Sequence, residues 1–359
     1  MAGENETKEL LAGLLAVLGE SSPAANSLDR FAHPDCRWDI FHPFNRLDGN
    51  RAAAAQFWGP LRAALPDYEH RTAFMLAGSY EGRAMVSSMG HLIGTFDYPL
   101  AGIPPTRGMI FLRFGIHGTV RDGLFSHIYV LLDLVDVMRQ AGVYPFRAMP
   151  GSSEQWPFPP SDTGASSHTI DFTQGVRSLQ IVHEMQMGLP SAGTKITAKS
   201  SKANHSHHWH QNMNWYGPAG IGSTRGRRGF RDFHGALFLQ AFGDRAGFPR
   251  IEGGPADAPG HFIRVGDGNF AVTSGWPSLH GTHTGSEWLG LPPTGRRIEM
   301  RVADWYRIDE QEKIIDNWVM IDIPHIVYQM GLDIFHDLKF RVDPSIERLP
   351  EPPLASAGE

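Results

Sequence analysis

Two aspartates stand at matching places in this chain, each directly before a stretch with helical spacing of apolar residues. Asp133 precedes residues 134–141 and Asp322 precedes residues 323–330. An aspartate in water has a pKa of about 3.9, but apolar neighbours disfavour its ionised form and raise that value. Such a carboxylate can take a proton from carbon beside a carbonyl, so each is a candidate general base. The alternative is that each aspartate caps the helix that follows it.

The two aspartates belong to an internal repeat. The run GIPPT at 102–106 returns as GLPPT at 290–294, and Trp38 matches Trp215. The offset grows only from 177 (215 − 38) to 189 (322 − 133), which indicates two copies of one unit with small insertions. The sequence therefore predicts a first domain at 1–146, a linker at 147–168, a second domain at 169–342 and a tail at 343–359.

Each copy is expected to begin with helices and to continue as a meander of strands. Helical patterns cover 51–65 and 229–241, and the turn Arg121-Asp122-Gly123 is typical of a hairpin. Helices followed by neighbouring strands favour an α+β fold. The expected strands are 85–94, 108–117 and 126–133 in the first copy, and 270–281, 296–307 and 313–322 in the second.

Side chains alternate across a strand, so every second residue of the last strand in each copy shares a face. In both copies this face mixes apolar bulk with polar groups and ends on the aspartate. We expect such a face to line a pocket rather than an apolar core. Its residues are His127, Tyr129, Leu131 and Asp133 in one copy and Asp316, Trp318, Met320 and Asp322 in the other.

Composition argues against several classes of protein. The net charge of −6 does not suit a nucleic acid or an anionic membrane as partner, and no apolar run is long enough to cross a bilayer. A single cysteine, Cys36, rules out a disulfide within the chain, and together with the absence of a signal-peptide pattern it favours the cytoplasm. The cluster His205, His207, His208 and His210 invites a metal site, but we expect a histidine-rich strand edge instead.

These motifs resemble those of the SnoaL-like polyketide cyclase family, in the nuclear-transport-factor-2-like superfamily. The pattern is G-T-H-x-G, then G-x-P-P-T-G, a strand with a tryptophan, an aspartate and a closing Q-x-G. The second copy carries it at 281–285, 290–295, Trp318, Asp322 and 329–331. The first copy has Phe96 in place of the histidine and Tyr129 in place of the tryptophan.

The resemblance implies two tandem cone-shaped domains, each a curved antiparallel sheet wrapped around helices and enclosing an apolar cavity. It implies acid/base catalysis by Asp322, and by Asp133 in the first copy, without metal or cofactor. His283 and Tyr216 would hold a developing oxyanion. The expected substrate-binding residues are Trp215, Trp318, Met320, His210, Trp38, His42, His117 and Tyr129, and His42 also stands three residues after Asp39 as a possible acid–base pair.

The sequence thus predicts an enzyme that acts on a small apolar or polyketide-like carbonyl compound by aldol-type cyclisation, isomerisation or dehydration. One alternative is a lyase or hydrolase in which an aspartate activates water to open a ring or an ester. A second alternative is a ligand-binding module without catalysis. The expected partner is a small molecule, and the two copies are expected to pair as a pseudo-dimer within the chain or to form a homodimer of such units.

Overall fold

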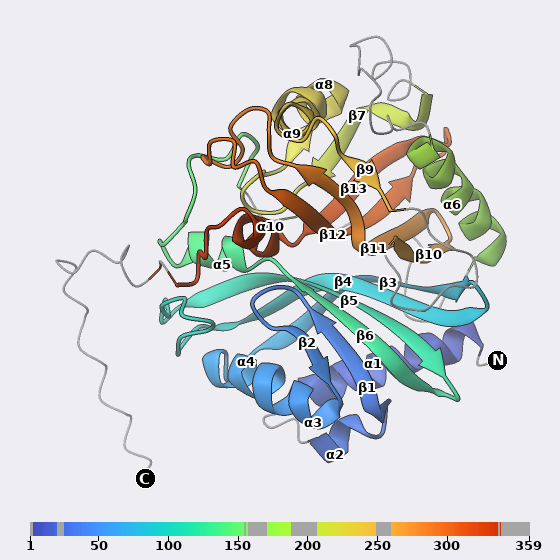
Figure 1. Cartoon of the computed structure of the whole chain (residues 1–359). Coiled ribbons are helices and arrows are strands. Elements are labelled where there is room, and N and C mark those ends of the chain that lie inside the picture. Colours follow the sequence, from blue (N-terminus) through green and yellow to red (C-terminus); the bar gives the residue numbers. More distant parts are fainter. Residues whose placement is uncertain are drawn as a thin grey trace.

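The computed structural model describes residues 3–19, 25–153, 156, 171–187, 207–248, 260–336 and 338. Each half of the chain forms a curved sheet with helices on one side (Figure 1). The two sheets face each other in the middle of the molecule. Helices α1 to α4 lie on the outer side of the first sheet, and α8 and α9 lie on the outer side of the second.

The first sheet has six strands in the order β2-β1-β6-β5-β4-β3. Its strands are β1 (Ala32–Ile40), β2 (Asn45–Asp48), β3 (Glu69–Tyr80), β4 (Arg83–Thr95), β5 (Met109–Arg121) and β6 (Leu124–Leu132). Its helices are α1 (Glu4–Leu18), α2 (Ala25–Leu28), α3 (Asn50–Ala53), the π-helical turn η1 (Ala54–Trp58), α4 (Gly59–Ala64) and α5 (Leu134–Gln140).

The second sheet repeats this topology in the order β10-β11-β12-β13-β7-β8, with β9 added beside β11. Its strands are β7 (Trp209–Tyr216), β8 (Thr224–Arg225), β9 (Ala246–Gly247), β10 (His261–Asp267), β11 (Phe270–Thr282), β12 (Arg297–Ile308) and β13 (Ile314–Ile321). Its helices are α6 (Phe172–Met187), α8 (Gly226–Phe230), the π-helical turn η2 (Arg231–Gly235), α9 (Ala236–Ala241) and α10 (Ile323–Gln329).

The expected α+β fold with two repeated domains is confirmed, and the six expected strands correspond to β4 to β6 and β11 to β13. One expectation needs correction, because the sheets are mixed rather than wholly antiparallel. Strand β1 runs parallel to β6, and β7 runs parallel to β13. The domain limits stay a prediction, and most of the linker and the whole tail at 343–359 lie outside the described residues.

The hairpin between β5 and β6 follows from its turn residues. Asp122 and Gly123 both have positive φ, of 50° and 78°, which glycine adopts freely and aspartate tolerates. Arg121 and Leu124 pair directly across this turn. The turn therefore fixes the register of β5 against β6, the strand that leads to Asp133, as the Asp-Gly signal predicted.

An aromatic and aliphatic layer fills the space between the two sheets. Tyr129 of β6 stacks on Phe262 of β10, with 3.8 Å between ring centroids. The Nε1 of Trp305 donates to Ser87 Oγ of the other domain at 2.8 Å. A Cβ at Gly115 would lie 2.7 Å from the Trp305 ring, so only glycine permits this approach. The sheets thus pack directly on each other.

This packing corrects the expectation that the shared face of the last strands lines a pocket. Tyr129, Leu131, Trp318 and Met320 all belong to the buried layer between the domains. The opposite faces of the same strands, with Val130 and Val319, point toward the helices of their own domain. Among the described helices, none is both long and apolar enough to cross a bilayer.

Candidate active site

Asp322 lies at the seam between the domains and is fully buried. It caps α10 by accepting from the backbone N–H of His325 at 3.2 Å. Its other oxygen accepts from Arg301 at 3.1 Å and from the backbone N–H of His42, in the first domain, at 3.0 Å. Burial raises the pKa of Asp322 to about 6, and Arg301 opposes that rise.

Asp133 repeats this arrangement at the equivalent point of the first domain. Its carboxylate accepts from the backbone N–H of Asp136 at 3.0 Å, from Arg113 at 2.9 Å and from the backbone N–H of Ala219, in the second domain, at 2.8 Å. Burial raises its pKa, while Arg113 acts in the opposite direction. Each aspartate therefore caps a helix, pairs with an arginine and accepts a hydrogen bond from the other domain. A catalytic role for either one stays a prediction.

The two predicted oxyanion-binding groups have other partners here. The Nε2 of His283 lies 3.0 Å from the carbonyl oxygen of Ser286, and its Nδ1 lies 3.3 Å from Thr294 Oγ1. The Tyr216 hydroxyl donates to Asp316 at 3.1 Å, and its ring stacks on Trp318. In these positions His283 ties two loops together and Tyr216 lies on the face toward the first domain.

The remaining predicted residues are spread over the molecule. His117 is fully buried between the domains, against Trp305, and bonds Ser87 at 2.9 Å. Trp38 donates to Asn50 within the first domain at 3.0 Å. His42 lies beside Tyr328 at the seam, with 4.9 Å between ring centroids.

The histidine cluster is only partly described, since His205 lies outside the described residues. His210 accepts from the backbone N–H of Asn212 at 3.1 Å. Within the described part of the chain, no three histidine, cysteine, aspartate or glutamate side chains are grouped as metal ligands.

A hollow of about 420 Å³ lies between the second sheet and its helices. That volume is in the range of sites for small molecules. Trp215 and Trp209 of β7 form part of its wall, while Ile321 and Ile326 close another part. The polar residues of the wall come from every side of the hollow: Gln186, His234, Arg245, His261, Arg264, Ser278, Asp304, Tyr306 and Asn317.

Asp304 is the one carboxylate among the described residues of this wall. It pairs with Thr273 on β11 and with Val319 on β13, and side chains paired across strands share a face. Protein surrounds the carboxyl, yet it keeps some accessible surface because it faces the hollow. Burial raises the pKa of Asp304 to about 7, against the lowering effect of hydrogen bonds from Asn317 and Tyr306.

A hydrogen-bonded network fixes the orientation of Asp304. Asn317 Nδ2 donates to its Oδ1 at 3.4 Å and to the carbonyl oxygen of Trp305 at 3.2 Å. The Tyr306 hydroxyl bonds to Asp304, and burial raises the pKa of Tyr306 so that it stays a neutral donor. Gln186 of α6 extends the network by donating to Thr273 Oγ1 at 2.9 Å.

His234 of η2 forms part of the wall on the helix side. Its ring stacks on Trp215, with 4.1 Å between centroids and 13° between planes. Burial, followed by the charge of Arg245, lowers the pKa of His234 to about 3. The imidazole is therefore neutral at physiological pH and can donate one hydrogen bond to a ligand atom.

The first domain has apolar residues at the corresponding places. The repeat offset of 188 to 189 aligns Asp304 with Ile116 (304 − 188) and Asn317 with Ile128 (317 − 189), in agreement with the strand pairings. Both isoleucines are fully buried, and Phe57 stands where the second domain has His234 (234 − 177). The first interior is therefore a packed apolar core at the points where the second carries acid, amide and imidazole.

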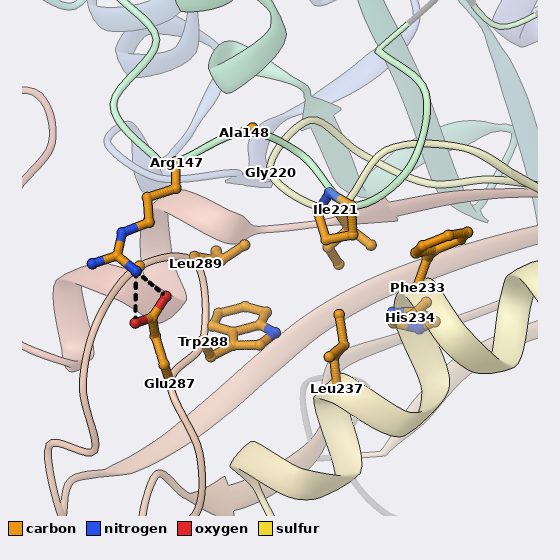
Figure 2. A pocket seen from close by; sticks show the side chains of 12 residues that line it. Arg147, Ala148, Gly220, Ile221, Phe233, His234, Leu237, Glu287, Trp288 and Leu289 are labelled. Atoms are coloured by element: carbon orange, nitrogen blue, oxygen red, sulfur yellow. Dashed lines mark hydrogen bonds and ion pairs between the residues drawn. The ribbon is translucent and has the colours of Figure 1, made fainter.

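A second hollow, of about 250 Å³, adjoins the cavity (Figure 2). The two share Ile221, His234 and Trp288 as wall residues. Arg147 and Glu287 pair on one side of it at 2.9 Å, and the helix that carries Phe233 and Leu237 borders the other side. Phe233 is 48% exposed, which leaves an apolar lip next to His234.

Sequence reasoning missed Asp304, Asn317 and His234, although a signal for each was present. Aligning the two copies sets a polar residue against an apolar one at all three positions. Such a difference marks the copy whose interior is open to a ligand, because a buried polar group without a purpose costs stability.

One known protein family matches this chain, and the match lies in its second half. The sequence model of the SnoaL-like polyketide cyclase family matches residues 271–330, from β11 to α10, which confirms the resemblance. No curated protein matches the chain.

Solved structures similar to this chain include a putative SnoaL-like polyketide cyclase from Jannaschia sp. CCS1. It is 22% identical over 40% of this chain and 94% of its own length, with a TM-score of 0.32. IdmH, a putative polyketide cyclase from Streptomyces antibioticus, is 20% identical over 37% of this chain and 89% of its own, with a TM-score of 0.29. A putative polyketide cyclase from Acidithiobacillus ferrooxidans is 18% identical over 43% and 94%, with a TM-score of 0.32.

Proposed function

We propose that this chain, which carries the sequence pattern of the SnoaL-like polyketide cyclases at residues 271–330, is an acid/base enzyme acting inside its second domain. Its substrate is a small, largely apolar carbonyl compound, and its reaction is of the cyclase or isomerase type. The observation that carries this proposal is a carboxyl group, that of Asp304, facing a hollow of about 420 Å³ with its pKa raised to about 7.

Asp304 is the proposed general base. A pKa of about 7 leaves much of the group ionised at neutral pH and makes the carboxylate a stronger base than an exposed aspartate. It takes a proton from the carbon next to the carbonyl and returns it, as the acid, to another atom of the substrate. Tyr306 and Asn317 hold the carboxyl in one orientation, so the proton leaves and returns along a fixed direction.

His234 is the proposed partner for the carbonyl oxygen. Removing a proton beside a carbonyl places negative charge on that oxygen, and a fixed donor in a dry site stabilises this charge. The neutral imidazole of His234 supplies an N–H without adding a full charge to the cavity. Trp215 keeps the ring in place by stacking on it.

The proposal predicts exchange of the carbon-bound protons of 2-tetralone, a small bicyclic ketone, when the protein is dissolved in D₂O. Proton NMR follows the loss of the signal beside the carbonyl. Asp304→Asn should lower the rate by about 100-fold or more, the usual size of a general-base contribution. Glu299→Gln removes an exposed carboxylate from the same strand and should leave the rate unchanged.

Equal exchange by the wild type and Asp304→Asn would contradict the assignment of the base. A melting temperature of Asp304→Asn that is no lower than that of the wild type shows that a lost rate is not lost folding. Loss of exchange in Asp322→Asn together with full exchange in Asp304→Asn would return the role to Asp322.

One observation favours a second reaction class, a lyase or hydrolase in which the aspartate activates water. An amide, Asn317, lies 3.4 Å from Asp304 and can hold a water molecule or a leaving group beside the carboxylate. Hydrolysis of methyl 2-naphthoate, with the same dependence on Asp304, would identify this class. Binding of both compounds without any turnover would identify a ligand-binding module instead.

A further inference from the structure

The cavity of the second domain has an excess of positive charge. Two arginines, Arg245 and Arg264, form part of its wall, and Asp304 is the only acid among the described wall residues. Burial keeps Asp304 neutral for a large fraction of the time near pH 7. The whole chain carries a net charge of −6, so this positive lining is a local feature of the cavity.

In the described part of the chain, no hydrogen bond or ion pair joins the guanidinium of Arg245 to another residue. Its Nε is buried without a hydrogen bond, and the group lies 5.7 Å from the centre of the Phe238 ring. Burial lowers the pKa of Arg245, because the charge has left water without gaining a counter-ion. An unpaired buried cation is costly, and a bound anion removes that cost.

A second unsatisfied polar atom lies further along the same wall. The Nδ1 of His261 is buried without a hydrogen-bond partner. His261 pairs with Gly275 of β11, and Ala246, directly after Arg245, pairs with His280 of the same strand. Gly275 in turn pairs with Val302, two residues before Asp304 on β12, whereas His280 pairs with Glu299. His261 therefore lies between Arg245 and Asp304 along the cavity, where it can bond the middle of a ligand that spans the two.

Arg264 differs from Arg245 because it already has partners. Its Nη1 lies 3.1 Å from His183 Nδ1 and donates to Gln186 Oε1 at 3.0 Å. Arg264 of β10 pairs with Thr273 of β11, which in turn pairs with Asp304 of β12. Arg264 therefore lies level with the proposed base across the sheet. Arg264 therefore holds the network around the base, and Arg245 is the cation left for a ligand.

The two ends of the cavity are separated along β12. Leu279, next to the His280–Ala246 pair, is paired with Met300, and Asp304 lies four residues further along the strand. Four residues of strand span roughly 13 Å. A ligand that reaches both Arg245 and Asp304 is therefore elongated, with its anionic group at one end and its reacting carbon at the other.

We propose that the ligand of this cavity is a carboxylate-bearing aromatic or polycyclic compound whose carboxylate is bound by Arg245. The binding step is independent of catalysis, although the identification of the ligand as a substrate rests on the proposed function. Carboxylates suit this site because a guanidinium binds both oxygens of the group at once. The aromatic wall of Trp209, Trp215 and Phe238 suits a flat apolar body.

The experiment compares 2-naphthoate with its methyl ester, which has the same ring system and no charge. Calorimetric titration of the full chain gives both dissociation constants without any need for turnover. The wild type should bind the carboxylate at least about tenfold more tightly than the ester, as expected for a charge-assisted pair in a partly desolvated site. Arg245→Gln should abolish this preference while leaving the affinity for the ester nearly unchanged.

Two further variants separate loss of the site from loss of the fold. Arg245→Lys keeps the charge and should retain part of the preference. Arg297→Gln removes an exposed arginine from β12 and should behave as the wild type. Equal affinity for the two compounds in the wild type would overturn the proposal, as would a full preference in Arg245→Gln.

Failure of the carboxylate proposal is distinguishable from failure of the acid/base proposal. Asp304→Asn should bind 2-naphthoate at least as well as the wild type, because it removes a negative charge from the cavity and leaves Arg245 in place. A retained preference in Asp304→Asn without any exchange of 2-tetralone by the wild type would support the anion site and contradict the proposed catalysis. Exchange without a preference for the carboxylate would do the reverse.

Discussion

Asp304 shows how one residue acquires a chemical role from its surroundings. The side chain is an ordinary aspartate on a strand, with no motif around it. Its raised pKa comes from burial, which outweighs the hydrogen bonds from Asn317 and Tyr306. Asp322 is buried as well, but Arg301 and two backbone N–H groups occupy its oxygens. The two differ in access, because Asp304 borders the hollow and Asp322 does not.

The pH dependence of stability tests the state of Asp304. Its folded pKa of about 7 exceeds its ordinary value of 3.8, so between these limits the folded chain binds a proton that the unfolded chain has lost. The group's favourable contribution is therefore present at low pH and disappears as the pH rises toward 7. The side chain of Asp304→Asn cannot ionise. The melting temperature of this variant, relative to that of the wild type, should therefore rise between pH 4 and about 8.

Differential scanning calorimetry of both proteins across this range measures the effect, with Glu299→Gln as the control. A constant difference in melting temperature would mean that Asp304 titrates near its ordinary value. The exchange rate of 2-tetralone should rise over the same range, with a midpoint at about pH 7, because only the carboxylate accepts a proton.

Helices α5 and α10 connect the domains through their first residues. Each begins with an aspartate that caps the helix, pairs with an arginine of its own sheet and accepts a backbone N–H from the other domain. Strands β12 and β13 of the second domain carry polar side chains that face the hollow. They place Asp304 and Tyr306 of β12 beside Asn317 of β13 on the face toward the helices.

Asp322→Ala should destabilise the protein by about 3 kcal/mol, since it removes a helix cap and leaves Arg301 without its buried partner. Urea unfolding measures the change. Asp322→Asn keeps the cap and should cost less. If instead stability is unchanged and 2-tetralone exchange is lost, Asp322 is a catalytic residue and the structural interpretation fails.

The whole molecule is held together by the layer between its two sheets. A buried ion pair lies at one side of this layer, where Lys8 of α1 reaches Asp267 of the second domain at 2.6 Å, and neither side chain is exposed. Asp267 also accepts the backbone N–H of Asp171. Helix α1 therefore contributes to the stability of both halves of the chain.

Lys8→Met should lower the free energy of unfolding by about 3–5 kcal/mol, because it leaves the Asp267 carboxylate buried and unpaired. The exposed pair of Arg177 and Glu312 offers a matched control, and Arg177→Met should cost much less than Lys8→Met because solvent screens an exposed ion pair. Adding Asp267→Asn to Lys8→Met should restore part of the loss. Equal effects of Lys8→Met and Arg177→Met in urea unfolding would show that the pair does not join the domains.

The sequence was sufficient for the repeat, the α+β fold and the three central strands of each sheet, β4 to β6 and β11 to β13. Pairs such as Asp133 and Asp322 reveal the two copies, and alternation along β6 and β13 shows which residues share a face. The outer strands β3 and β10 were not predicted. The second copy was also correctly identified as the one that keeps the family pattern, which matches at residues 271–330.

Only the tertiary structure decided which face of each strand looks into a cavity. A period of two residues separates two faces but does not say which one the protein covers with its other half. The second domain covers the face of Tyr129, and the first covers that of Trp318, so the opposite face with Asn317 borders the hollow. Packing between segments far apart in the chain decides which face of a sheet the other domain covers. The alternation of residues along one strand cannot predict that packing.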